Sequence, residues 1–149
     1  LKALPQATTI HLATHGLLEY GQIDNLDAPG ALALTPNGDK DGLLTAREIA
    51  NLNLTADLVI LSACDTGRGT ITGDGVLGLA RSWLAAGTKD IVVSLWAVND
   101  RSTSQLMTQF YQNLETQPDK AIALRSAMLT TMKKHPQPRD WGAFTLIGN

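Results

Sequence analysis

The chain contains one cysteine, Cys64 in the segment LSACDTGRG, and a His15-Gly16 pair in the segment HLATHG. A thiol becomes a strong nucleophile when a nearby imidazole takes its proton, and backbone N–H groups stabilise the oxyanion that then forms. Cys64 could supply the sulfur and His15 the acid and base. The backbone N–H groups of Gly16 and Cys64 would form the oxyanion hole, because glycine lets a substrate carbonyl approach closely. These residue types predict a cysteine hydrolase with a Cys-His pair.

Since His15 and Cys64 are 49 positions apart, neighbouring strands must bring them together. Residues 7–16 and 56–64 are apolar and rich in β-branched side chains, so we expect two buried strands that end near His15 and Cys64. Two further strands are expected at residues 89–96 and 141–148.

The segments between these strands have helical or turn patterns. A short helix after Thr45, with Glu48 in capping-box spacing, and longer helices at 75–87, after an Asp100 cap and at 119–134 are expected. A turn-rich segment between residues 31–34 and 42–45 predicts an antiparallel hairpin. Alternation of strands and helices predicts an α/β fold, a three-layer sandwich with a mostly parallel sheet. In such folds the active groups lie beyond the C-terminal strand ends.

Composition sets the class of protein. The 149 residues are 44% hydrophobic, which suits one domain. A net charge of -2 and a pI near 5.8 argue against nucleic acid or an anionic membrane as partner. One cysteine and no apparent leader favour a cytoplasmic setting. Because the chain starts at Leu1, we expect it to be part of a longer protein.

Four segments together resemble one family. HLATHG, LVILSACDTGRG, GDGVLGLARSWLAAGTKDIVVSLWAVND and WGAFTLIG are similar, in this order, to the CHAT family of caspase-like peptidase domains, and the resemblance covers nearly all of residues 1–149. It implies a caspase-hemoglobinase fold with Cys64 as nucleophile and His15 as general base. It further implies upstream tetratricopeptide repeats in the same chain and additional strands before residue 7, as the C-terminal portion of a longer protein.

The resemblance also implies where substrate binds. Trp96 and its neighbours in SLWAVND match the region that lines the substrate cleft in such folds. The sequence lacks the Gln-Ala-Cys-x-Gly pattern of the caspases and their Ser-Trp-Arg segment, which argues against cleavage after aspartate. Asp65 or Asp100 could instead favour a basic substrate residue through charge-assisted hydrogen bonds.

Each of these residues also has a simpler interpretation. Cys64 could be a small core residue, and Asp100 a helix N-cap. His11 and His15 could suggest a metal site, but no glutamate follows His11 and no third ligand has recognisable spacing, so neither a metal nor a cofactor is expected. His11 is then a partly buried structural residue on the same strand face as His15. The glycine-rich segment 67–75 lacks the Lys-Ser/Thr of a phosphate-binding loop, so a surface or substrate-gating loop is expected.

The sequence therefore predicts a cysteine endopeptidase that binds a protein substrate in extended form and cleaves it through an acyl-enzyme. The alternative is a catalytically silent caspase-like domain that serves as an interaction scaffold.

Overall fold

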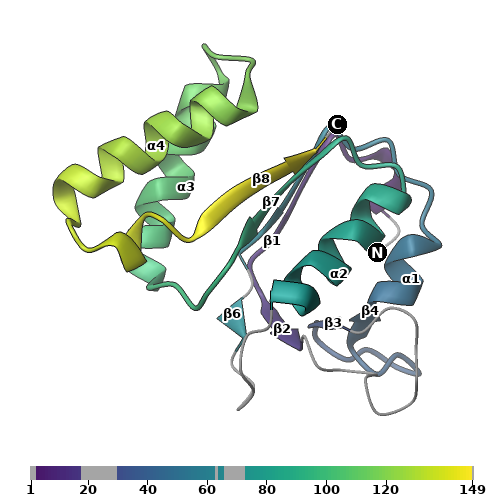
Figure 1. The fold of residues 1–149 in the computed structure, drawn as a ribbon. Coiled ribbons are helices and arrows are strands. Elements are labelled where there is room, and N and C mark those ends of the chain that lie inside the picture. Colours follow the sequence, from purple (N-terminus) through teal and green to yellow (C-terminus); the bar gives the residue numbers. More distant parts are fainter. Residues whose placement is uncertain (1–2, 18–29, 63, 66–72, 149) are drawn as a thin grey trace.

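The computed structural model describes residues 3–17, 30–62, 64–65 and 73–148. Strands and helices alternate along much of this part of the chain (Figure 1). In chain order, the elements are η1 (Leu4–Gln6), β1 (Thr9–Leu12), β2 (His15–Leu17), β3 (Ala31–Ala33), β4 (Leu43–Thr45), α1 (Ala46–Ala50), β5 (Leu58–Leu61), β6 (Cys64–Asp65), α2 (Gly73–Ala85), β7 (Asp90–Ser94), α3 (Asp100–Leu114), α4 (Lys120–Lys134), η3 (Pro138–Asp140) and β8 (Phe144–Gly148).

The main sheet has four strands in the order β1-β5-β7-β8. The first three are parallel, and β8 is antiparallel to β7. A single helix after β7 would carry the chain back to the edge of the sheet where β7 begins, and the next strand would be parallel to β7. Helices α3 and α4 together carry the chain back to the edge where β7 ends, so β8 is antiparallel. Helices α1 and α2 lie on one side of this sheet and α3 and α4 on the other (Figure 1). The predicted α/β class with a mostly parallel sheet is confirmed.

The two central strands of the main sheet, β5 and β7, are buried on both faces, as expected for continuous apolar strands. All four residues of β5 are buried. Because side chains alternate along a strand, Val59 and Leu61 belong to one hydrophobic cluster with Trp83 of α2. Leu58 and Ile60 belong to the other, with Phe110 of α3. The two clusters hold the helices to the sheet and fix the strand ends that lead to the candidate site.

A second sheet lies beyond the C-terminal ends of β1 and β5, in the order β4-β3-β2-β6. The antiparallel β3–β4 pair confirms the predicted hairpin. In its connection, the N–H group of Leu34 donates to the carbonyl of Gly42 at 2.6 Å, and Gly42 has a φ of 81°. Strand β2 pairs with β3 on one side and, in parallel, with β6 on the other.

The helix ends agree with the sequence at two positions. The predicted capping box is present, with Thr45 and Glu48 each accepting a hydrogen bond from the other's backbone N–H group. Helix α2 ends at Ala85, and Gly87 follows with a φ of 108° at a point where a Cβ atom would collide with the carbonyl oxygen of Leu54. None of the helices in the described ranges is long and apolar enough to cross a membrane.

The start of α3 differs from the prediction. Asn99, not Asp100, is the N-cap, and its side-chain oxygen accepts hydrogen bonds from the N–H groups of Arg101 and Ser102. Asparagine caps a helix as well as aspartate does. Asp100 is therefore the first helical residue, where its charge is favourable near the positive end of the helix dipole.

The expected strands at residues 7–16 and 56–64 are each divided, and the prediction of continuous strands is wrong. β1 ends at Leu12, and the chain enters the second sheet at His15. Between them, the Thr14 hydroxyl donates a hydrogen bond to the carbonyl of Ala33 in β3. This contact with the hairpin accompanies the departure of the chain from the main sheet. On the neighbouring strand, β5 ends at Leu61 and β6 begins at Cys64.

Candidate active site

His15 and Cys64 are backbone partners in the parallel β2–β6 pair. In the main sheet, β1 and β5 pair in parallel up to Leu12 and Leu61. These two residues are also 49 positions apart, so the register of the main sheet continues into the second sheet. Neighbouring strands are about 4.8 Å apart, and the register therefore brings together the backbones of the two predicted catalytic residues.

One backbone hydrogen bond connects the two chain segments at the junction between the sheets. The N–H group of Ser62 donates to the carbonyl of Leu12 at 3.2 Å. Two residues separate Leu12 from His15, and two residues likewise separate Leu61 from Cys64. Equal connections on the two neighbouring segments preserve the pairing across the gap.

The predicted oxyanion residues lie on the same two strands. Gly16 is buried, pairs with Asp65 of β6 and lies opposite Leu32 of β3. The side chain of His15 is exposed. The side chains of Cys64 and Asp65 lie outside the described part of the structure, so their predicted contacts stay predictions.

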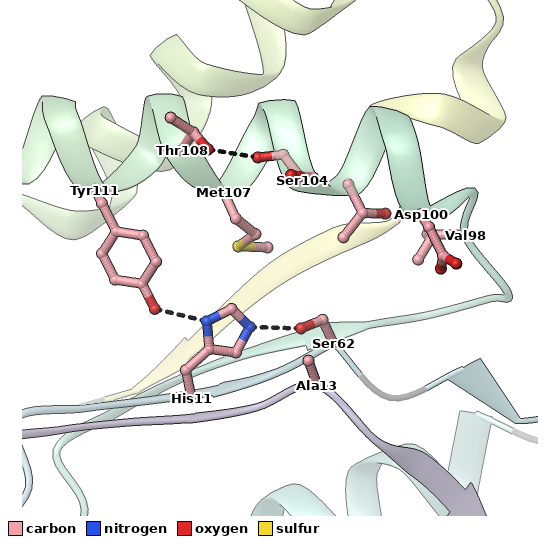
Figure 2. A pocket seen from close by; sticks show the side chains of 10 residues that line it. His11, Ala13, Ser62, Val98, Asp100, Ser104, Met107, Thr108 and Tyr111 are labelled. Carbon is pink, nitrogen blue, oxygen red and sulfur yellow. Dashed lines mark hydrogen bonds between the residues drawn. The ribbon is translucent and has the colours of Figure 1, made fainter.

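A cavity of about 390 Å³ lies between the ends of β1 and β5 and the facing side of α3. Its floor includes Ala13 and Ser62, each two residues before a predicted catalytic residue. The side chains that line it are His11, Ala13, Ser62, Val98, Asp100, Thr103, Ser104, Met107, Thr108 and Tyr111 (Figure 2). The cavity thus adjoins the backbone pair of His15 and Cys64.

His11 lies at the centre of a hydrogen-bonded row in this cavity (Figure 2). Its Nε2 atom is 2.6 Å from the Ser62 hydroxyl, and its Nδ1 atom is 2.8 Å from the Tyr111 hydroxyl. Desolvation lowers the pKa of His11 below its ordinary value, and burial raises the pKa of Tyr111. Both shifts favour the uncharged form of the group.

The expected shared strand face of His11 and His15 is a wrong prediction. His11 belongs to β1 in the main sheet, whereas His15 belongs to β2 in the second sheet. Among the residues that the structure describes, no group of three or more His, Cys, Asp or Glu side chains could hold a metal ion.

The predicted substrate-binding residues are separated in the fold. Asp100 lines the cavity with His11 and Ser62. Trp96, 37% exposed, is not among the described lining residues and donates from its indole N–H to the carbonyl of Arg139 at 3.2 Å. Most of the glycine-rich segment 67–75 falls outside the described residues, so its predicted gating role does too.

Sequence reasoning missed Ser62 and Tyr111 as residues of this region. Ser62 is two residues before Cys64, so the SAC segment itself carried a signal. Tyr111 lies 100 positions from His11, and only the packing of α3 against the sheet reveals their contact.

Comparison with known proteins shows the family to which the chain is related. The family model described as the CHAT domain matches residues 1–149. Tetratricopeptide repeat protein 28 of Mus musculus is 35% identical over 109 residues, which cover 72% of this chain and 4% of that protein. The protein of the same name from Homo sapiens is 35% identical over the same length and the same shares. The chain thus spans only a small part of the curated relatives that it matches.

Proposed function

The chain belongs to the CHAT domain family, and from this premise we propose that it is a cysteine endopeptidase that uses Cys64 and His15. The observation that carries the proposal is the register that makes these two residues backbone partners. The single cysteine of the chain is thereby the neighbour of a histidine that is followed by glycine. This is the residue set that thiol acyl transfer requires.

The proposed reaction has two steps. The Cys64 thiolate attacks the peptide carbonyl, the C–N bond breaks, and His15 gives a proton to the departing amine. Water then attacks the thioester while His15 takes a proton from it, the C–S bond breaks, and the acid product leaves with the thiolate restored. In both steps the N–H groups of Gly16 and Cys64 stabilise the oxyanion.

The lining of the cavity supports a substrate class for this proposal. Asp100 is the only carboxylate among its described lining residues, which include neither lysine nor arginine. Val98 and Met107 add apolar surface. Ala13 and Ser62 each lie two positions before a residue of the catalytic pair, which corresponds to at most roughly 7 Å along the chain. A long basic side chain next to the scissile bond would therefore reach Asp100 along an apolar wall, a fit that favours arginine or lysine.

The setting of the reaction is also a proposal. The relatives are named for tetratricopeptide repeats, and we infer that such repeats in the same chain present the protein substrate to this domain. A reducing cytoplasmic compartment would keep Cys64 as a free thiol.

The test is a cleavage assay with the full-length protein that carries this domain, in which new peptide termini from a proteome digest are counted by mass spectrometry. We expect cleavage by the wild type and none by Cys64→Ala or His15→Ala, while the surface variant Arg125→Ala cleaves as the wild type does. Equal cleavage by the wild type and Cys64→Ala would overturn the proposal and leave the interaction scaffold as the better assignment.

The proposed preference for a basic side chain of the substrate is tested by a separate substitution. Asp100→Asn keeps the shape of the side chain and removes its charge. Because a hydrogen bond to a charged group contributes about 1.5–3 kcal/mol, kcat/KM for substrates with arginine at the cleavage site should fall about 10- to 100-fold. An unchanged preference for arginine would show that Asp100 does not bind the basic side chain.

A further inference from the structure

The junction between the two sheets lies directly before the candidate pair on both chain segments. Within the described residues, strands β2 and β6 share two residue pairs, His15–Cys64 and Gly16–Asp65. A slip of one residue moves every side chain of a strand to its opposite face. Strand β2 is also held by its pairing with β3, and contacts at the junction add to the hold on this register.

Ser62 is the residue where the two segments are tied together. Its backbone N–H group donates to the carbonyl of Leu12, and its hydroxyl is 2.6 Å from Nε2 of His11. It is half-buried and two residues before Cys64. Ser62 thus has both a backbone and a side-chain connection to the strand that leads to His15.

His11 in turn is held from the other side. Its Nδ1 atom meets the Tyr111 hydroxyl at 2.8 Å, and the two rings lie 5.9 Å apart with planes inclined by 41°. Both ring nitrogens are therefore engaged, which fixes the ring orientation. In the neutral imidazole, one nitrogen donates and the other accepts, so the three groups form a directional hydrogen-bonded row. Figure 2 shows the row crossing from α3 to the end of β5.

We propose that Ser62, His11 and Tyr111 form a positioning network that holds Cys64 in register with His15 and ties that register to α3. The inference rests on the proposed function, because it concerns the reactivity of Cys64. None of the three is assigned a chemical step. Since Asp100 and Met107 of α3 line the same cavity, a side chain bound there would contact the helix that anchors the network.

The experiment measures the rate of Cys64 alkylation by iodoacetamide against pH in the full-length protein, alongside the melting temperature. The variants are Ser62→Ala, Tyr111→Phe and the two combined. Thr130→Val is the matched control, because it removes a helix hydroxyl that donates to the Ser126 carbonyl within α4. In a protein with other cysteines, the Cys64 peptide is followed by mass spectrometry.

We expect the wild-type thiol to titrate below its ordinary pKa near 8.5. Ser62→Ala should raise the thiol pKa by about one unit, which slows alkylation at pH 7 by up to about 10-fold. Tyr111→Phe should act in the same direction. The combined variant should equal Ser62→Ala, because both changes interrupt one row. Thr130→Val should leave the profile unchanged.

The outcomes separate the two proposals. A depressed wild-type pKa that is unaltered in Ser62→Ala and Tyr111→Phe would overturn the positioning network and leave the peptidase assignment intact. A wild-type thiol with the ordinary pKa would contradict both. If Ser62→Ala does not fold, Tyr111→Phe and Ser62→Thr decide the question, and Ser62→Thr should restore the wild-type profile because it keeps the hydroxyl.

Discussion

The β1–β5 pair and the β2–β6 pair share one register but are held in different ways. β1 and β5 pair over four residues each, and β5 is buried throughout by helices on both sides. β2 and β6 pair over two residues each in the described part of the chain, and His15 is exposed. The long pair is stabilised by burial, whereas the short pair receives its alignment from it. Stability and the proposed chemistry are therefore located on separate parts of the same two chain segments.

Replacing the exposed histidine should produce the largest effect on activity. His15→Ala should reduce peptide cleavage by about 10³-fold or more, as expected when one member of a catalytic pair is removed. Because the side chain is exposed, the free energy of unfolding should change by less than about 1 kcal/mol. Cleavage kinetics and urea unfolding on the same preparation measure both quantities. A large loss of stability would show that β2 contributes to the core after all.

Replacing a buried side chain of the β1–β5 pair should have the opposite result, a large loss of stability with little loss of activity. Ile60 is fully buried in the cluster beneath α3. Ile60→Ala should lower the free energy of unfolding by about 2–5 kcal/mol, because it removes buried methyl groups and leaves a cavity. Cleavage per folded molecule should stay within a few-fold of the wild type. If cleavage falls as steeply as stability, the two pairs are not separable.

A smaller effect is expected beside the second sheet, where β4 continues into α1. Thr45→Ala removes the N-cap of α1, including the bond that its hydroxyl accepts from the Glu48 N–H group at 3.2 Å. The expected loss is about 1 kcal/mol in the free energy of unfolding. Denaturant unfolding against the wild type measures it, and a change near zero would mean that water replaces the cap.

The smallest effect is a pH dependence at the junction between the two pairs. Burial lowers the pKa of His11 in the folded protein, so the unfolded chain takes up the proton first. Stability from the neutral imidazole is complete above the unfolded pKa near 6.5 and is lost as the pH falls through that value toward the lower folded pKa. Urea unfolding of the wild type and His11→Gln between pH 7.5 and 5 tests the sign. The free energy of unfolding of the wild type should fall relative to that of His11→Gln as the pH is lowered. A relative rise would contradict the lowered pKa of His11.

The sequence predicts the main sheet well because its strands are recognised locally. The apolar segments of β5 and β7 have the length and composition of buried strands. Gly87 and the Thr45–Glu48 pair mark helix ends by chemistry within a few residues. Such signals need no knowledge of the rest of the fold.

The division of the first predicted strand depends on a distant contact. Thr14 is β-branched and suits a continuing strand, but its hydroxyl bonds to Ala33, 19 residues away. The contact between Tyr111 and His11 likewise joins residues 100 positions apart. Helical periodicity identifies the buried face of α3, but how that helix lies across the sheet depends on the packing of the whole core.

Paired residues are 49 positions apart both in the β1–β5 pair and in the β2–β6 pair, so the lengths of the two connections depend on each other. An extra residue in the hairpin turn between β3 and β4 leaves both connections at their present length. One inserted between Leu12 and His15 would advance the second strand by about 3.3 Å and turn its side chains over. Only a matching insertion before Cys64 would restore the pairing. Chain length is thus free to vary in the turns and is fixed in two short connections, whose lengths must change together.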